Sequence, residues 1–149
     1  MTVNWAEFEG AAPELAAFGR GRLAGRVSYL ATVRADGGPR VHPVTPQVGG
    51  GRLYVYMEPT SPKGHDLHRD PRFALHGGVE DNDGGAGEFI VHGRAELITD
   101  PHVRAECDSL ASYTPRERYI LFELRIERAL GTTYSDDGPI RKQWRSESK

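Results

Sequence analysis

Cysteine is nearly absent from this chain of 149 residues, since Cys107 is the only one. A single cysteine cannot form a disulfide or a cysteine-based metal site within the chain. Long hydrophobic runs are missing too, and none approaches the roughly 20 apolar residues that a membrane-spanning helix needs. The N-terminus shows no charged segment followed by an apolar one, which a secretory signal would have. We therefore expect a soluble, cytoplasmic protein that has no membrane partner.

An excess of basic residues is also absent. The 21 aspartates and glutamates outnumber the 19 lysines and arginines, which gives a formal net charge of −2 and a pI near 6.3. Because a nucleic-acid-binding surface is normally basic, nucleic acid is not an expected partner. Lysine is rarest of all: Lys63, Lys142 and Lys149 are the only ones. Lys63 is therefore conspicuous.

The length is that of one domain, residues 1–149, and is sufficient for a hydrophobic core without disulfides or metal. Segments rich in β-forming residues recur along the chain, mostly separated by turns that contain Gly or Pro. Their spacing predicts a mainly β fold, a barrel of about six to seven mostly antiparallel strands with short flanking helices. The expected strands are 27–34, 39–48, 53–57, 72–76, 88–99, 119–134 and about 140–144. Short helices are expected within 4–26, from Pro62 to the Asp70-Pro71 pair, and from Pro101 to about Leu110.

Three features modify these strands. Pro43 and Pro46 prevent segment 39–48 from being an ordinary central strand, because proline donates no ladder hydrogen bond. Gly93 predicts a bulge or bend in segment 88–99. A bend is also expected near Gly131.

The most informative stretch runs from Leu53 to His76. In the strand at its start, apolar residues alternate with Tyr54 and Tyr56, a period-2 pattern with two distinct faces. Ser61 then occupies a helix N-cap position and Pro62 the first helical position. A helix start carries free N–H groups and the positive end of the dipole, and Lys63 adds a full charge. The sequence therefore predicts an anion-binding seat here.

Four segments resemble the pyridoxamine 5'-phosphate oxidase-like superfamily. They are LATVRADGGPRVHPV (30–44), LYVY (53–56), SPK (61–63) and LHRDPRFAL (67–75). The resemblance implies a Greek-key split β-barrel that forms a homodimer, with cofactor sites in grooves at the subunit interface. Most members bind FMN, whereas related branches use the deazaflavin coenzyme F-420 or bind haem.

The resemblance also implies the roles of particular residues. Ser61 and Lys63 would contact the cofactor phosphate. The strand around Val44 would lie along the edge of the isoalloxazine ring, and Trp144 could reach the ring of the partner subunit. The predicted cofactor-binding set is His42, Val44, Thr45, Tyr56, Met57, Ser61, Lys63 and Trp144; no catalytic residue and no metal ligand is assigned.

The sequence departs from the family at three cationic positions. Typical oxidases have a basic residue where Pro62 stands, and Arg and Lys where Val41 and Pro46 align. Arg40 could replace the first of these two only if its side chain points the right way. Charge-assisted hydrogen bonds contribute about 1.5–3 kcal/mol each, so these losses weaken the case for tight FMN binding.

Two functions therefore remain open. The first is a flavin-dependent oxidoreductase that acts on a small-molecule substrate, with FMN as first choice and coenzyme F-420 as alternative. The second is a binder of flavin or haem without turnover. No serine-nucleophile motif is present, so in an enzyme the cofactor would supply the chemistry.

Each predicted contact also has a structural alternative. One of Tyr56 and Met57 must belong to the core, because their side chains alternate. His42 could be a surface residue, and Trp144 could be a packing aromatic at the chain end. His65 and His68 lie three apart on one helix face and could hold a metal, but no third ligand is placed nearby in the sequence.

Overall fold

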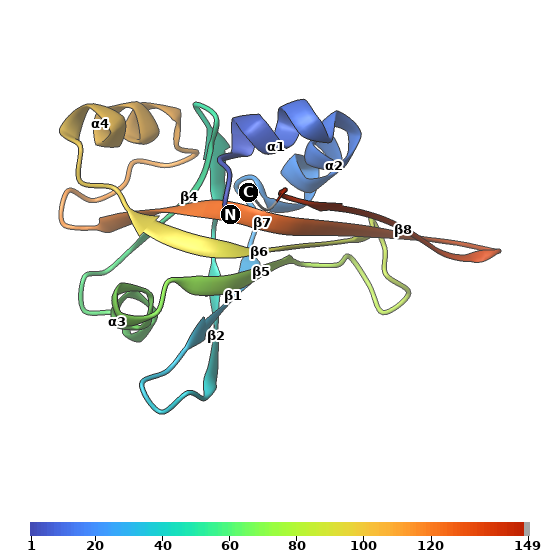
Figure 1. Cartoon of the computed structure of the whole chain (residues 1–149), viewed down its shortest axis with the longest axis horizontal. Helices are drawn as coiled ribbons and strands as arrows, with labels where there is room; N and C mark the ends of the chain where they lie inside the picture. Colours follow the sequence, from blue (N-terminus) through green and yellow to red (C-terminus); the bar gives the residue numbers. More distant parts are fainter. Residues whose placement is uncertain (148–149) are drawn as a thin grey trace.

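The chain folds around one antiparallel β-sheet that curls into an open barrel (Figure 1). The computed structural model describes residues 1–147. The sheet follows the order β2-β1-β5-β6-β7-β4-β3, and β8 pairs with β7 outside this path. The strands are β1 (Ser28–Val33), β2 (Pro39–Val44), β3 (Gln47–Gly49), β4 (Arg52–Met57), β5 (Arg72–Gly77), β6 (Glu88–Leu97), β7 (Ile120–Ser135) and β8 (Gly138–Arg145). The helices are α1 (Trp5–Ala11), α2 (Pro13–Leu23), α3 (Pro62–Arg69) and α4 (Pro101–Leu110).

The predicted split-barrel fold is confirmed, with one difference in the strands. The segment expected as a single strand, 39–48, divides into β2 and β3 at Thr45-Pro46. These two strands lie at opposite ends of the sheet path although they are neighbours in the chain. The opening of the barrel therefore falls where Pro46 interrupts the strand, and Pro43 lies in an edge strand that pairs only with β1.

Strand β4 has the two apolar faces that its alternation predicts. Leu53 and Met57 belong to the main core, whereas Tyr54 and Tyr56 form a second cluster with Cys107 of α4. The Tyr54 hydroxyl donates a 3.0 Å hydrogen bond to the Cys107 carbonyl oxygen. Helix α4 therefore covers the face of β4 that the barrel interior does not use.

The two glycines expected to bend strands behave differently. Gly93 lies at a register shift between β6 and β7, and a Cβ there would collide with the Arg125 carbonyl oxygen. A bulge is thus present at Gly93, but its extra residue, Glu127, lies on β7 and not in the predicted segment 88–99. Gly131 lies in a part of β7 that keeps its register with β6, so no bulge occurs there, and the bend expected near it stays a prediction. Its missing side chain instead lets Leu15 of α2 pack closely, since a Cβ would lie 2.9 Å from Leu15 Cδ1.

Helices α1 and α2 pack against each other and over β6 and β7 on the inner side of the sheet (Figure 1). The outer face of β1 and β2 has no such cover, and it exposes Tyr29 (48%) and Val41 (61%). No helix within residues 1–147 is long and apolar enough to cross a membrane.

Candidate functional site

The start of α3 has the local structure that the sequence predicts. The Ser61 hydroxyl accepts a 3.2 Å hydrogen bond from the Gly64 N–H, and Pro62 is the first helical residue. Asp70 ends the helix, because the residue before proline avoids the helical region. Ser61 therefore acts as an N-cap.

Lys63 is half-buried at this helix start, and its ammonium group has no hydrogen bond or ion pair with any residue in 1–147. Burial lowers the pKa of its ammonium group, since no neighbouring carboxylate compensates the desolvated charge. The backbone contributes less than expected: Pro62 has no N–H, and the Gly64 and His65 N–H groups bond to Ser61. An anion at this helix start could therefore bind the Lys63 ammonium and the Lys63 backbone N–H, but not several free backbone N–H groups.

The floor beneath this helix start is apolar. A Cβ at Gly64 would lie 3.2 Å from Met57 Sδ and 3.3 Å from Ile120 Cδ1, so the helix rests directly on these two side chains. Met57 is 4% exposed and belongs to the main core. Met57 and Ser61 thus both lie against Gly64, and Lys63 is the residue before Gly64 in the same helical turn.

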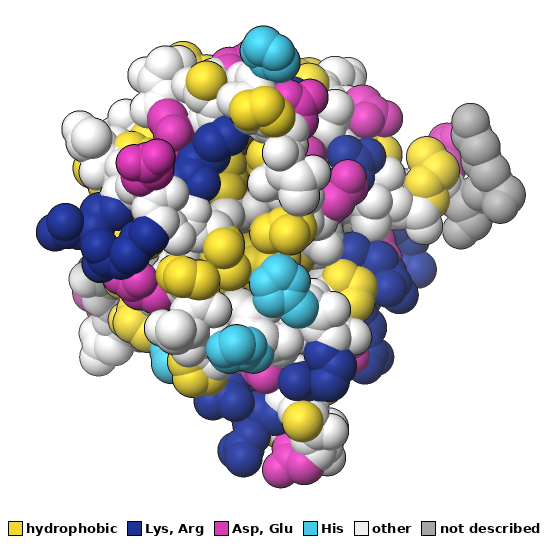
Figure 2. Space-filling view, turned by 90° about the vertical axis from the view of Figure 1, so that its left-hand side faces the viewer, with side chains coloured by type: hydrophobic (Ala, Val, Ile, Leu, Met, Phe, Trp, Pro, Cys, Tyr) yellow, Lys and Arg dark blue, Asp and Glu magenta, His cyan; other side chains and the backbone are white. Residues whose placement is uncertain are grey.

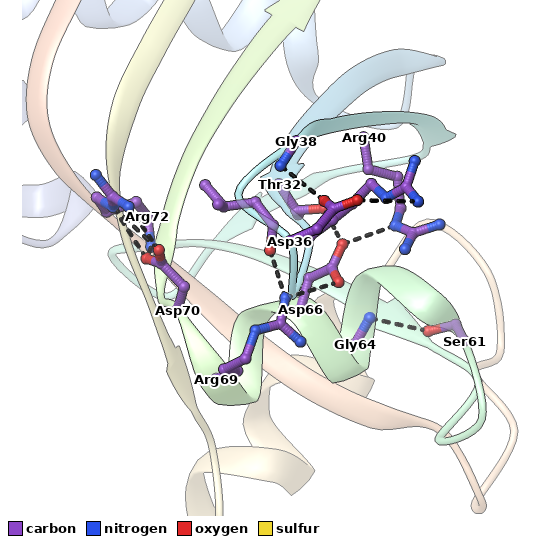
Figure 3. A network of polar contacts seen from close by, with 12 residues as sticks. Thr32, Asp36, Gly38, Arg40, Ser61, Gly64, Asp66, Arg69, Asp70 and Arg72 are labelled. Atoms are coloured by element: carbon purple, nitrogen blue, oxygen red, sulfur yellow. Dashed lines mark hydrogen bonds and ion pairs between the residues drawn. The ribbon is translucent and has the colours of Figure 1, made fainter.

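Asp66 fastens α3 to the β1–β2 hairpin (Figure 3). Its buried carboxylate accepts hydrogen bonds from Thr32 Oγ1 (2.7 Å), Arg40 Nε (2.7 Å) and Arg69 (3.1 Å). Burial opposes the charged form, but the hydrogen bonds outweigh it and hold the pKa of Asp66 below its usual value. This network fixes the anion seat relative to β2.

The alternation of side chains along β2 determines the direction in which Arg40 projects. Its Nε is bound to Asp66, so the side chain projects toward α3, whereas Val41 projects from the opposite face of β2. Arg40 therefore does not replace the cation that the family carries at Val41. Arg40 instead lines an open groove of about 390 Å³ between the hairpin and α3, together with Pro62 and His65.

The other predicted residues of β2 lie close to the opening of the barrel. His42 is half-buried, pairs in register with Leu30 and lies on the same face of the strand as Arg40. Val44 is 8% exposed and packs in the main core. Thr45 is exposed at the break between β2 and β3. The roles predicted for these three residues remain predictions.

Tyr56 and Trp144 lie apart from the α3 seat. Tyr56 projects to the α4 side of β4, where its hydroxyl donates a 2.7 Å hydrogen bond to Asp108. Burial, followed by this carboxylate, raises the pKa of Tyr56 well above its usual value. Trp144 packs on Phe8 of α1 with ring centroids 5.1 Å apart, as the packing alternative describes. Its predicted reach to a partner's ring stays a prediction.

Figure 2 shows the side of the molecule that carries α3 and α4, where hydrophobic side chains gather in the middle with histidines beside them. His65 and His68 are both exposed on α3, and the His68 ring lies 5.2 Å from that of Phe122. Across residues 1–147, no group of three potential ligand side chains is placed to hold a metal ion.

The sequence did not single out a second polar region, on the outer face of the sheet. His92, Arg128 and Arg145 line two adjoining hollows there, of about 430 and 490 Å³. Alternation along each strand could have placed all three on the outer face, but only the register between β6, β7 and β8 shows that they are neighbours.

An open antiparallel sheet of this order, with a short helix between β4 and β5, defines a split β-barrel. The profile of the family described as pyridoxamine 5'-phosphate oxidase matches residues 13–132. The chain therefore belongs to the pyridoxamine 5'-phosphate oxidase-like family. No match was found among curated proteins.

Solved structures with the same fold differ in what they bind. A haem-binding protein from Mycobacterium smegmatis is 20% identical with a TM-score of 0.62, and the match covers 80% of this chain and 53% of that one. PhzG from Burkholderia lata 383, in complex with tetrahydrophenazine-1-carboxylic acid, is 14% identical with a TM-score of 0.65 (96% and 88% covered). An F-420 reductase is 20% identical with a TM-score of 0.57 (74% and 94% covered). The chain thus spans about half the length of the first of these proteins, and at such identities the likeness shows the fold.

Proposed function

We propose that this protein is a flavin-dependent oxidoreductase that acts on a small molecule in a groove at a dimer interface. FMN is the first cofactor to test and coenzyme F-420 the alternative. The observation that carries the proposal is Lys63, a desolvated ammonium without a protein counter-ion in residues 1–147. A cofactor phosphate would supply the missing negative charge.

The residues around Lys63 fit a phosphate in chemistry and position. Lys63 lies in the first turn of α3, beside Gly64, which rests on Met57, and the Asp66 network keeps α3 in place. When bound, the cofactor ring would exchange a hydride with the substrate. The chain's own part would be to bind the phosphate, orient the ring and exclude water.

A binder without turnover is the second candidate function. The chain has one cation at the seat where typical members have more, and a structural neighbour is a haem-binding protein. Exposed His65 and His68 on α3 would be the nearest imidazoles to such a ligand on this helix.

A homodimer is part of the proposal. The outer face of β1 and β2 exposes Tyr29 and Val41 without a covering helix, and a stable interface buries about 800 Å² on each partner. Tyr29→Glu should therefore shift the protein toward monomer in sedimentation velocity. A monomeric wild-type protein would contradict the dimer.

The cofactor is tested by the absorbance spectrum of the purified protein and by titration with FMN, coenzyme F-420 and haem. Lys63→Ala should weaken binding of the preferred cofactor by roughly tenfold to a hundredfold, since a charge-assisted hydrogen bond contributes about 1.5–3 kcal/mol. The control is Lys142→Ala, which removes an exposed lysine paired with Glu14 at 3.5 Å. Unchanged affinity in Lys63→Ala would contradict the phosphate assignment, and binding of none of the three would contradict both functions.

A further inference from the structure

A row of side chains crosses the outer face of the sheet from β5 to β8. In register, Ala74 pairs with His92, His92 with Arg128, and Arg128 with Arg145. Directly paired residues of antiparallel strands project from the same face, with their Cβ atoms about 4.5–5.5 Å apart. Because Val91, next to His92, is fully buried in the core, the row faces outward.

The positive charge of this row is not compensated by the residues in 1–147. Arg128 and Arg145 lie directly opposite each other, a placement that is unfavourable for like charges. Neither guanidinium group has a hydrogen bond or an ion pair with any described residue. Glu127 is the one carboxylate among the described residues that line the groove, and it lies 3.4 Å from Arg94. Arg72 at the groove edge is paired with Asp70 at 2.6 Å.

The surroundings of the two arginines form a groove of suitable size for a small molecule. His92, Arg128 and Arg145 line both of the adjoining hollows, which measure about 430 and 490 Å³. Pockets for small ligands typically measure about 300–1,000 Å³. Ile90 and Leu130 lie in the neighbouring transverse row and give one hollow an apolar wall. Burial and Arg128 both lower the pKa of His92, so its ring is mainly uncharged near pH 7 and can donate or accept a hydrogen bond.

We propose that this groove is a second ligand site that binds a small organic phosphate. Arg128 and Arg145 bridge the phosphate oxygens, and the organic part lies on Ile90 and Leu130. Guanidinium groups suit this role because their planar N–H donors match two phosphate oxygens at once. The site is separate from the α3 seat, since Lys63 is not among the residues that line it; of the residues predicted to bind the cofactor, Trp144 lines one hollow.

The test uses phenyl phosphate and inorganic phosphate as probes, with the amide and arginine Nε–H signals of the ¹⁵N-labelled protein as readout. The Lys63→Gln background removes the other anion seat. Phenyl phosphate should shift signals around His92, Arg128 and Arg145 and bind more tightly than inorganic phosphate. Arg128→Gln or Arg145→Gln should each raise the dissociation constant about tenfold or more.

The matched control is Arg141→Gln, which removes the same charge from the same strand and face, four residues away. It should leave the dissociation constant unchanged; an equal loss would mean a general charge effect and would overturn the site. The proposal is also wrong if neither phosphate shifts the NMR signals of His92, Arg128 and Arg145 while Arg128→Gln changes the sedimentation coefficient. The arginines would then belong to a protein interface. Loss of cofactor in Lys63→Ala tests the other seat and has no bearing on this result.

Discussion

Replacing Asp66 by asparagine removes one charge and almost no volume from the network that fastens α3 to the hairpin. The Asp66 carboxylate is 2% exposed and receives three hydrogen bonds, two of them from guanidinium groups. Thr32 and Arg40 both donate to Oδ2, whereas Arg69 donates to Oδ1. An asparagine oxygen in the place of Oδ2 can accept from Thr32 and Arg40, but its amide then faces the Arg69 donor. The variant therefore loses the bond from Arg69, and the bond from Arg40 loses its anionic acceptor.

The size of the effect follows from the exposure of the two arginines. A hydrogen bond to a charged group contributes about 1.5–3 kcal/mol. Arg40 and Arg69 are 29% and 42% exposed, so water can replace part of what each loses. We therefore expect Asp66→Asn to lower the free energy of unfolding by about 2–3 kcal/mol, with an unchanged dependence on urea concentration.

The pH dependence has a definite sign. Burial raises the pKa of Asp66, but the hydrogen bonds from Thr32, Arg40 and Arg69 outweigh it, and the folded-state pKa lies below the usual value. The stabilisation is therefore complete above the unfolded-state pKa of about 3.9 and is lost as the pH falls through the lower folded-state pKa. The difference between wild type and Asp66→Asn should be constant at pH 6–8 and shrink below about pH 4.

Urea denaturation followed by circular dichroism measures both quantities. The control is Asp36→Asn, at an exposed carboxylate of the same hairpin, where asparagine is an equally good turn residue. A loss below about 0.5 kcal/mol for Asp66→Asn, or a loss equal to that of Asp36→Asn, would refute the claim that this network holds α3 in place.

Three further substitutions test separate parts of the structure. Ser61→Ala removes the cap of α3 and should cost about 1 kcal/mol in urea denaturation; no loss would contradict the cap. Gly93→Ala forces a Cβ onto the Arg125 carbonyl oxygen and should cost about 3 kcal/mol, whereas Gly21→Ala, in open space on α2, should not destabilise. Val41→Arg places a cation at the exposed position where typical family members carry one, and it should strengthen FMN binding about tenfold in a fluorescence titration. Unchanged affinity would mean that the phosphate does not lie near residue 41.

The local features of the fold could be predicted because each depends on residues that are close in the sequence. The cap at Ser61, the end of α3 before Pro71 and the two faces of β4 follow from spacing and side-chain type. The division of strand 39–48 was missed. A single proline is compatible with an edge strand, and only the sheet order shows that the two halves pair at opposite ends.

The candidate site was harder to predict, because its contacts join segments that are distant in the sequence. Ser61 and Lys63 could be identified from one turn of helix. The partner of Arg40, however, is Asp66, 26 positions away, and nothing in the spacing fixes that pair. The outer row is more distant still, since two separate strand pairings align His92, Arg128 and Arg145.

The position of Arg40 beside Val41 bears directly on the choice of cofactor. A shift of one residue along a strand moves a side chain to the opposite face of the sheet, so an arginine next to the family position does not replace one in it. Here Arg40 is bound to Asp66, and the face where the family has its cation presents Val41. The proposed phosphate seat would therefore depend on Lys63 for its charge. With one cation at the phosphate, the ring and the other groups of the cofactor would have to supply more of the binding free energy, and this is the physical reason to test coenzyme F-420 and haem beside FMN.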